Sequence, residues 1–129
     1  MREFAAEWAR CRDWLEAALE YSAGMYEIED VEKGIADGSM IFLPGEHSAV
    51  VLEVHAYPNG KALHVFLGGG ERGHAMREYV TKMEDCIVAL AKTLDCRWIT
   101  HYTRKSGERI GQRLGYKKQW AVMIKEVCH

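Results

Sequence analysis

Hydrophobic residues near the start of the chain recur at helical spacing. The first stripe consists of Phe4, Trp8, Cys11, Leu15, Ala18 and Leu19. It predicts an amphipathic helix over residues 3–22 that ends near Gly24. A shorter stripe of Ile28, Val31 and Ile35 predicts a second helix over residues 28–36, with Gly38 as its stop.

The pattern then changes to short apolar runs separated by turn residues. The runs at residues 40–43, 49–56 and 62–67 predict three strands. The Asn59-Gly60 pair indicates a two-residue hairpin turn, because both central residues of a type I′ turn need positive φ. In that register, residues whose numbers sum to 119 lie opposite each other. His55 then faces His64, and Glu53 faces Phe66.

The second half alternates between helical and strand-like patterns. Apolar residues from Met76 to Leu94 predict a long helix, on which Cys86, like Cys11 on the first helix, lies on the apolar face. Residues 96–102 predict a strand, residues 106–114 a short helix that ends at Gly115, and residues 120–127 a last strand. The order predicts an α/β fold, in one domain over residues 1–129, with a central, mostly antiparallel sheet flanked by helices.

The bulk composition limits the classes of function. The chain has 129 residues, 48% of them hydrophobic, with a net charge of −2, which gives no general reason to expect a nucleic acid partner. It has no apolar run long enough for a membrane helix and no apolar signal core at its start. Its four cysteines are widely spaced without a C-x-x-C motif, so we expect reduced thiols and a cytoplasmic protein.

The stretch from Leu67 to Met76 holds four glycines, at positions 68, 69, 70 and 73. It lies between a predicted strand and the long predicted helix. Such a turn exposes backbone N–H groups beside the positive end of a helix dipole, where a phosphate or pyrophosphate binds. The alternative interpretation is a flexible surface turn.

The order of elements and this glycine turn resemble the GNAT family of N-acetyltransferases. Residues 70–75 match the glycine and alanine positions of the family's acyl-CoA motif, with Gly70 where the family has Gln or Arg. Residues 109–116 are similar to the family's late helix and its Leu-Gly-Phe sequence. The late helix carries Gly111 where many members have a tyrosine that protonates the thiolate of CoA. Residues 53–61 and 107–116 also resemble a divergent, bacteriophage-encoded branch.

The resemblance implies acetyl-CoA, or CoA, as the co-substrate. The implied contacts are the strand backbone at Phe66 and Leu67 and the motif residues Gly70, Glu71, Arg72, Gly73, His74 and Ala75. In the basic run that follows the next strand, Arg104 and Arg109 are candidates for the 3′-phosphate. The alternative for this run is a solvated helix face.

Acyl transfer to an amine needs a base near the thioester carbonyl. Glu53, His55 and His64 share one face of the predicted hairpin and are the candidates, with an ordinary polar sheet face as the alternative. Tyr102 is the candidate acid in place of the missing tyrosine. No metal site is predicted, because no third ligand accompanies the two histidines at convincing spacing.

Two functions therefore stay open. The first is an acetyl-CoA-binding N-acetyltransferase that acts on an unknown amine or protein acceptor. The second is an inactive interaction, assembly or regulatory protein of phage origin, which could be virion-associated. A third interpretation, nucleic-acid binding by residues 104–118, is opposed by the acidic remainder of the chain. The sequence leaves a homodimer open.

Overall fold

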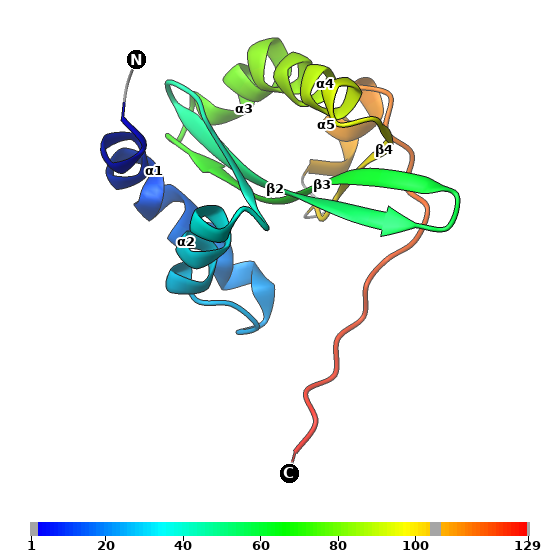
Figure 1. Ribbon diagram of the computed structural model, residues 1–129, viewed down its shortest axis with the longest axis horizontal. Helices are drawn as coiled ribbons and strands as arrows, with labels where there is room; N and C mark the ends of the chain where they lie inside the picture. The colour runs from blue at the N-terminus through cyan, green and yellow to red at the C-terminus, as the bar shows by residue number, and fades with distance from the viewer. Residues whose placement is uncertain (1–2, 104–106, 129) are drawn as a thin grey trace.

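Four strands form a single sheet in the order β1-β2-β3-β4, and helices lie on both of its faces (Figure 1). The strands are β1 (Ile41–Pro44), β2 (Ser48–Tyr57), β3 (Gly60–Gly70) and β4 (Cys96–His101). The first three pair antiparallel, and β4 pairs parallel to β3. This computed structural model describes residues 3–103 and 107–128. It confirms the predicted mixed, mostly antiparallel sheet.

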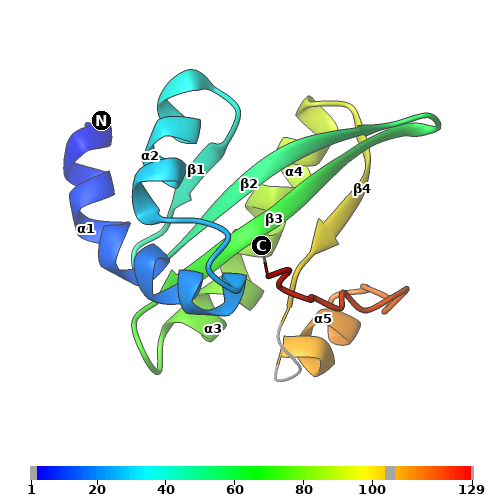
Figure 2. The same ribbon diagram turned by 90° about the horizontal axis from the view of Figure 1, so that it is seen from below.

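Two N-terminal helices cover one face of the sheet (Figure 2). Helix α1 (Phe4–Ala18) continues into a 3₁₀ turn at Leu19–Ser22, and α2 (Ile28–Asp37) begins with a capping box and ends at Gly38. Their apolar stripes pack on alternate residues of β2 and β3. The buried core of this face is Trp8, Cys11, Leu15, Leu19, Ile28, Val31, Met40, Ala49, Val51 and Leu67. Both predicted helices are confirmed to within a few residues at their ends.

The long predicted helix covers the opposite face, but it is not a regular α-helix. It consists of α3 (Ala75–Glu78), a π-helical turn at Tyr79–Met83, and α4 (Glu84–Thr93). The π turn inserts an extra residue and rotates the following positions around the helix axis. Ile87 is therefore buried against the sheet, whereas Cys86 is exposed. The prediction that Cys86 lies in the core is wrong.

The β2–β3 hairpin turns one residue earlier than the Asn59-Gly60 pair predicts. Tyr57 pairs with Gly60, so the two loop residues are Pro58 and Asn59. Glu53 consequently lies opposite His64 rather than Phe66, and the predicted register is wrong by two residues. Since side chains alternate with a period of two, this error leaves the predicted residues on the same face.

Three of the four glycines lie inside β3 rather than in a turn. Gly68, Gly69 and Gly70 pair with Val50, Ala49 and Ser48. A side chain on Gly69 would place its Cβ 2.5 Å from the carbonyl oxygen of Trp14, because α1 crosses the strand there. A Cβ on Gly70 would collide with the backbone of His47. These two glycines are therefore needed for close packing, and the turn is limited to residues 71–74.

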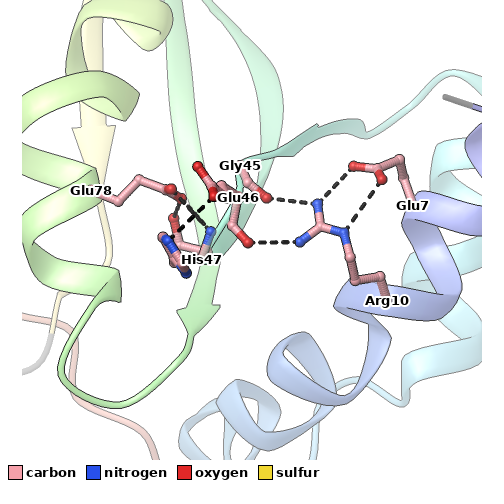
Figure 3. A network of polar contacts seen from close by, with 7 residues as sticks. Glu7, Arg10, Gly45, Glu46, His47 and Glu78 are labelled. Atoms are coloured by element: carbon pink, nitrogen blue, oxygen red, sulfur yellow. Dashed lines mark hydrogen bonds and ion pairs between the residues drawn. The ribbon is translucent and has the colours of Figure 1, made fainter. Parts of the chain in front are cut away.

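The turn between β1 and β2 is held from two sides (Figure 3). On the α1 side, the guanidinium of Arg10 pairs with Glu7, with 2.7 Å between Nη2 and Oε2. It also donates to the carbonyls of Gly45 and Glu46, at 2.6 and 2.9 Å. These bonds fix the start of the turn to α1.

On the other side, the buried carboxylate of Glu78 accepts hydrogen bonds from the hydroxyl of Ser48, at 2.5 Å, and from the N–H of His47, at 3.0 Å. Burial opposes ionisation of Glu78, but these hydrogen bonds outweigh it and lower the pKa of its carboxyl. The β1–β2 turn thus joins α1 on one face to α3 on the other.

The C-terminal part holds α5 (Glu108–Arg113), which ends before Gly115, and then an irregular segment. Residues 120–128 form no strand, so the predicted last strand is wrong. Within the described residues, no helix combines the length and the hydrophobicity that crossing a membrane requires.

The close approach of α1 to β3 is testable with two alanine substitutions. We expect Gly69→Ala to lower the free energy of unfolding by about 1–3 kcal/mol, because the new methyl group overlaps the Trp14 backbone. Gly68→Ala is the matched control. Its Cβ would lie 3.6 Å from Val50 Cγ1, an ordinary contact, and we expect a change within about 1 kcal/mol. Equal denaturant midpoints for the two variants would contradict this account of Gly69.

Candidate functional site

A cleft opens where β3 and β4 separate. Their parallel register runs from Lys61↔Cys96 to Val65↔His101 and then stops, so Phe66–Gly70 has no β4 partner among the described residues. The cleft measures about 2290 Å³ and also extends along the 3₁₀ turn after α1, the tip of the β2–β3 hairpin and residues 117–122 and 124. The register of β3 against β2 also shifts just before this point, which makes Phe66 the extra residue of a bulge. Bulges of this kind re-aim strands and occur beside active sites.

The loop at the head of α3 forms one end of the cleft. The carbonyl of Glu71 accepts from the N–H groups of His74 and Ala75, at 3.1 and 2.9 Å, which closes a tight turn with Gly73 at φ +89°. The N–H groups of Arg72, Gly73, Met76 and Arg77 form no hydrogen bond with the described part of the chain. Free N–H groups at a helix N-terminus favour an anion.

Most of the residues predicted to contact a cofactor line the cleft. They are Phe66, Leu67, Gly70, Glu71, Arg72, Gly73 and Ala75. His74 lies outside it: its ring stacks on that of His47 at 5.0 Å between centroids, beside a separate pocket of about 390 Å³. Arg109 is exposed on α5 and is not among the residues that line the cleft. Arg104 lies outside the described residues.

The predicted acid–base residues are brought together on the face of the sheet that borders the cleft. His55 Nε2 lies 3.5 Å from Glu53 Oε1. The ring of His55 stacks on that of His64 at 4.9 Å, and the ring of Tyr102 meets His64 edge-on at 4.3 Å. All four side chains line the cleft. Glu53, His55 and Tyr102 are partly or largely accessible, whereas His64 is buried.

His64 is held as a neutral imidazole. Burial, and then the nearby His55 and His101, lower its pKa to about 4. Its Nδ1 forms a 2.7 Å hydrogen bond with Thr100 Oγ1. Its Nε2 is the one buried side-chain nitrogen or oxygen of the described residues that has no hydrogen-bond partner. An unpaired buried polar atom costs about 1–3 kcal/mol, which favours a site where water or a ligand supplies the partner.

A second polar cluster, which the sequence analysis missed, lines the same cleft. Tyr79 Oη lies 2.7 Å from His101 Nε2, and the hydroxyl of Tyr116 donates to Glu84 at 2.8 Å. Burial and the Glu84 carboxylate raise the pKa of both tyrosines, so both hydroxyls stay protonated. Burial lowers the pKa of His101 to about 4. Tyr79 falls within the predicted helix from Met76 to Leu94, and no sequence signal pairs it with His101, because its direction depends on the π turn that begins at this residue.

Glu46, His47 and Glu78 place one ligand atom each within 4.8 Å of one another. This grouping is absent from the sequence analysis, which had considered only His55 and His64. The oxygens of Glu78 already accept the two hydrogen bonds described above, and His47 Nδ1 pairs with Glu71 Oε2 at 2.9 Å. We interpret the group as part of the hydrogen-bonded network that holds the β1–β2 turn against α3.

The two buried histidines predict a pH dependence of stability. Both have pKa values of about 4 in the folded chain, below the usual 6.5. Between pH 4 and pH 6.5 the unfolded chain therefore binds more protons than the folded chain. We therefore expect the free energy of unfolding to fall as the pH drops from 6.5 to 4, by about 1–3 kcal/mol per histidine. His64→Asn, which keeps a partner for Thr100, should flatten this slope in urea unfolding. His74→Gln, at an exposed position, should keep the slope of the native protein. Equal slopes in the native protein and both variants would refute the assignment of the pH dependence to His64.

Comparisons with known proteins identify the fold. No family model and no curated protein matches the sequence. A probable acetyltransferase of known structure matches with a TM-score of 0.70 at 10% identity, over 98% of this chain and 100% of its own. A possible acetyltransferase from Clostridium difficile 630 matches with a TM-score of 0.66 at 10% identity, over 100% of this chain and 97% of its own.

A predicted acetyltransferase from Clostridium acetobutylicum, solved with acetyl-CoA, matches with a TM-score of 0.62 at 14% identity. The match covers 75% of this chain and 71% of that chain. At such low identities the likeness shows the fold alone. The chain therefore has the GNAT acetyltransferase fold, as the order of its elements predicted.

Proposed function

We propose that this protein binds acetyl-CoA, or CoA, in the cleft between β3 and β4 and transfers the acetyl group to an amine. The observation that carries the proposal is the end of β3–β4 pairing at Val65 and His101. It leaves the backbone edge of Phe66–Gly70 facing a roomy cleft. The neighbour from Clostridium acetobutylicum, which shares this fold, holds acetyl-CoA.

The described residues fit such a ligand. Free N–H groups at Arg72, Gly73 and Met76 would hold the pyrophosphate, and the guanidinium of Arg72 can pair with a phosphate oxygen. The strand backbone at Phe66 and Leu67 would orient the thioester carbonyl. Acetyl-CoA supplies the activated acetyl group; the protein supplies its position and the proton transfers.

His55 and Glu53 are the base that we propose. An amine must lose a proton as its nitrogen attacks the thioester carbon, and His55 can accept that proton while the carboxylate of Glu53, 3.5 Å away, stabilises the resulting imidazolium. His64 is less suited to this role, because a group with a pKa of about 4 is a weak base. We assign to His64 a hydrogen bond through Nε2 to the acceptor or to a water molecule.

Tyr102 is the acid that we propose. When the carbon–sulfur bond breaks, the thiolate needs a proton, and Tyr102, which directly follows the last residue of β4, lines the cleft. The late helix has no tyrosine for this purpose, since Gly111 occupies that position. The absence of a tyrosine at position 111 also supports the alternative proposal, in which the protein binds CoA, or only a protein partner, and catalyses no reaction.

Ligand binding is tested by thermal and chemical unfolding with acetyl-CoA and desulfo-CoA. Ligand at 100 times its dissociation constant should add roughly 2.7 kcal/mol to the free energy of unfolding. Gly73→Val should abolish the shift, because it distorts a loop residue at φ +89°. Gly38→Val, at φ +86° and away from the cleft, is the matched control for backbone strain and should keep the shift. No shift at millimolar ligand in the native protein would refute CoA binding.

Turnover is tested by chromatographic detection of CoA released from acetyl-CoA with a panel of amines. We expect Glu53→Gln and His55→Gln to lower kcat about 10²–10⁴-fold without weakening the binding of acetyl-CoA. His74→Gln, outside the cleft, should leave the rate unchanged. Full activity in both base variants would refute the assigned base. Binding without any turnover by the native protein would favour the inactive alternative.

A further inference from the structure

One end of the cleft lies between the N-terminal helices and the sheet (Figure 2). One side of this end is formed by the last turns of α1 and by residues 19–26, which lead to α2. The other side is the face of β2 and β3 that carries Glu53, His55, His64 and Phe66. We call this part of the cleft the acceptor end, because the residues to which we assign the proton of the amine lie here.

The charged side chains at the acceptor end are acidic. They are Asp13 on α1, Glu20 in the 3₁₀ turn and Glu53 on β2. Up to Gly70, no Lys or Arg of the described residues lines the cleft. None of the ion pairs between described residues involves Asp13 or Glu20. A cleft lined by charge of one sign raises the local concentration of the opposite charge, so the acceptor end favours a cation.

The basic residues that line the cleft come from other elements. They are Arg72 in the loop before α3, Arg97 on β4, and Lys117 and Lys118 after α5. The guanidinium of Arg97 lies over the ring of Trp98, 4.7 Å from its centroid. Arg72 belongs to the loop that we propose for the pyrophosphate. An anionic acetyl donor and a cationic acceptor therefore have separate parts of one cleft.

The walls of the acceptor end are largely aromatic. Tyr26, from the loop before α2, meets Phe66 of β3 edge-on, with 4.6 Å between the ring centroids. Trp14 and Tyr21 line the same end, and Tyr21 and Met25 are each 62% exposed. Aromatic rings bury the apolar part of a ligand and attract a cation to their faces. These walls favour a ligand that combines a cation with an apolar group.

The acceptor end also contains a buried hydrogen-bonding atom without a partner. The side chain of His64 is 3% exposed, and its Nε2 has no partner among the described residues. With the ring proton on Nδ1, which then donates to Thr100 Oγ1, Nε2 accepts a hydrogen bond. The ring of His55 stacks on this imidazole at 4.9 Å. Independently of the charges, this atom points to a ligand with an N–H donor beside the proposed base.

We propose that the acceptor is a primary arylalkylamine, in which a short chain joins an ammonium group to an aromatic ring and there is no carboxylate. This inference rests on the proposed acetyl transfer. The ammonium would lie beside Glu53, His55 and His64, and the ring against Tyr26 and Phe66. The carboxylate of an amino acid would be repelled by the acidic side chains, and the hydroxyl groups of an amino sugar would meet aromatic walls.

The bound ammonium loses two protons during the reaction. One passes to water before the attack, and His55 accepts the other as the nitrogen lone pair forms the bond to the thioester carbon. The electron pair of the broken carbon–sulfur bond stays on sulfur, which takes a proton from Tyr102. The proton on His55 then restores that of Tyr102 through solvent. The products are the N-acetylated amine, the thiol of CoA and one proton released to water.

The first experiment compares four compounds by isothermal titration calorimetry at pH 7, on the full chain saturated with desulfo-CoA, which cannot react. 2-Phenylethylamine carries the cation and the ring, 2-phenylethanol lacks the cation, phenylalanine adds a carboxylate, and ethanolamine lacks the ring. We expect 2-phenylethylamine to bind at least about tenfold more tightly than each of the others. Equal affinity for any of the other three overturns the proposal.

The acidic lining is tested with two double variants that change the net charge equally. Asp13→Asn/Glu20→Gln should weaken the binding of 2-phenylethylamine roughly 3- to 10-fold at low ionic strength. Glu16→Gln/Asp85→Asn removes two charges from exposed positions that do not line the cleft, and it should leave the affinity unchanged. Equal weakening by both variants would show an effect of net charge alone and would overturn the assigned site.

The aromatic wall is tested with Tyr26→Leu, which we expect to weaken the binding of 2-phenylethylamine roughly 3- to 10-fold. Phe4→Leu removes a half-exposed ring outside the cleft and should have no such effect. Urea midpoints of both variants verify that they fold. Native affinity in folded Tyr26→Leu contradicts the assigned wall.

Binding of desulfo-CoA to the native protein, measured first by thermal unfolding, separates this inference from the proposed function. If desulfo-CoA binds and the selectivity among the four compounds is absent, the acceptor class is wrong and the proposed function stands. If desulfo-CoA does not bind, acetyl transfer fails, and the role of the amine as its acceptor fails with it. No binding of 2-phenylethylamine at millimolar concentration overturns the inference in either case.

Discussion

The close approach of other elements to the backbone of Gly69 and Gly70 is the constraint on which the rest of the structure depends. α1 crosses β3 at Gly69, where a Cβ would lie 2.5 Å from the carbonyl oxygen of Trp14. The β1–β2 turn and Ala75 meet the chain at Gly70. Since Arg10 and Glu78 hold the same turn from opposite faces, the end of β3 becomes the point where both layers of helices are joined to the sheet.

This packing determines where the cleft lies. β3 is held against β2 by antiparallel pairing up to Gly70, so it cannot follow β4 when the parallel pairing ends at Val65. The bulge at Phe66 and the π turn at Tyr79–Met83 flank the point of separation. A β-bulge and a π turn each change the direction in which the following side chains point, and both are common beside functional sites. The cleft in which we propose that an acyl-CoA binds therefore lies where the parallel pairing of β3 and β4 ends.

The polar groups around the cleft divide into two sets with different environments. Glu53, His55 and Tyr102 remain accessible, as the proton transfers that we propose for them require. His64 and His101 are held neutral by burial, and Tyr79 and Tyr116 are held protonated beside Glu84. The accessible set would carry the proton transfers that we propose, while the buried set forms a fixed hydrogen-bonded frame.

The sequence by itself determined the elements whose residues repeat with a clear period: both N-terminal helices, the four strands of the sheet and their order in the α/β fold. It also placed Glu53, His55 and His64 on one face, since a register error of two residues preserves the alternation. Only the tertiary structure decided that Gly69 and Gly70 serve packing, because the sequence does not reveal which backbone approaches a glycine. Likewise, the apolar run from Trp120 to Ile124 indicates a strand, but a strand forms only where a neighbouring strand supplies its hydrogen bonds, and residues 120–128 pair with none in the structure.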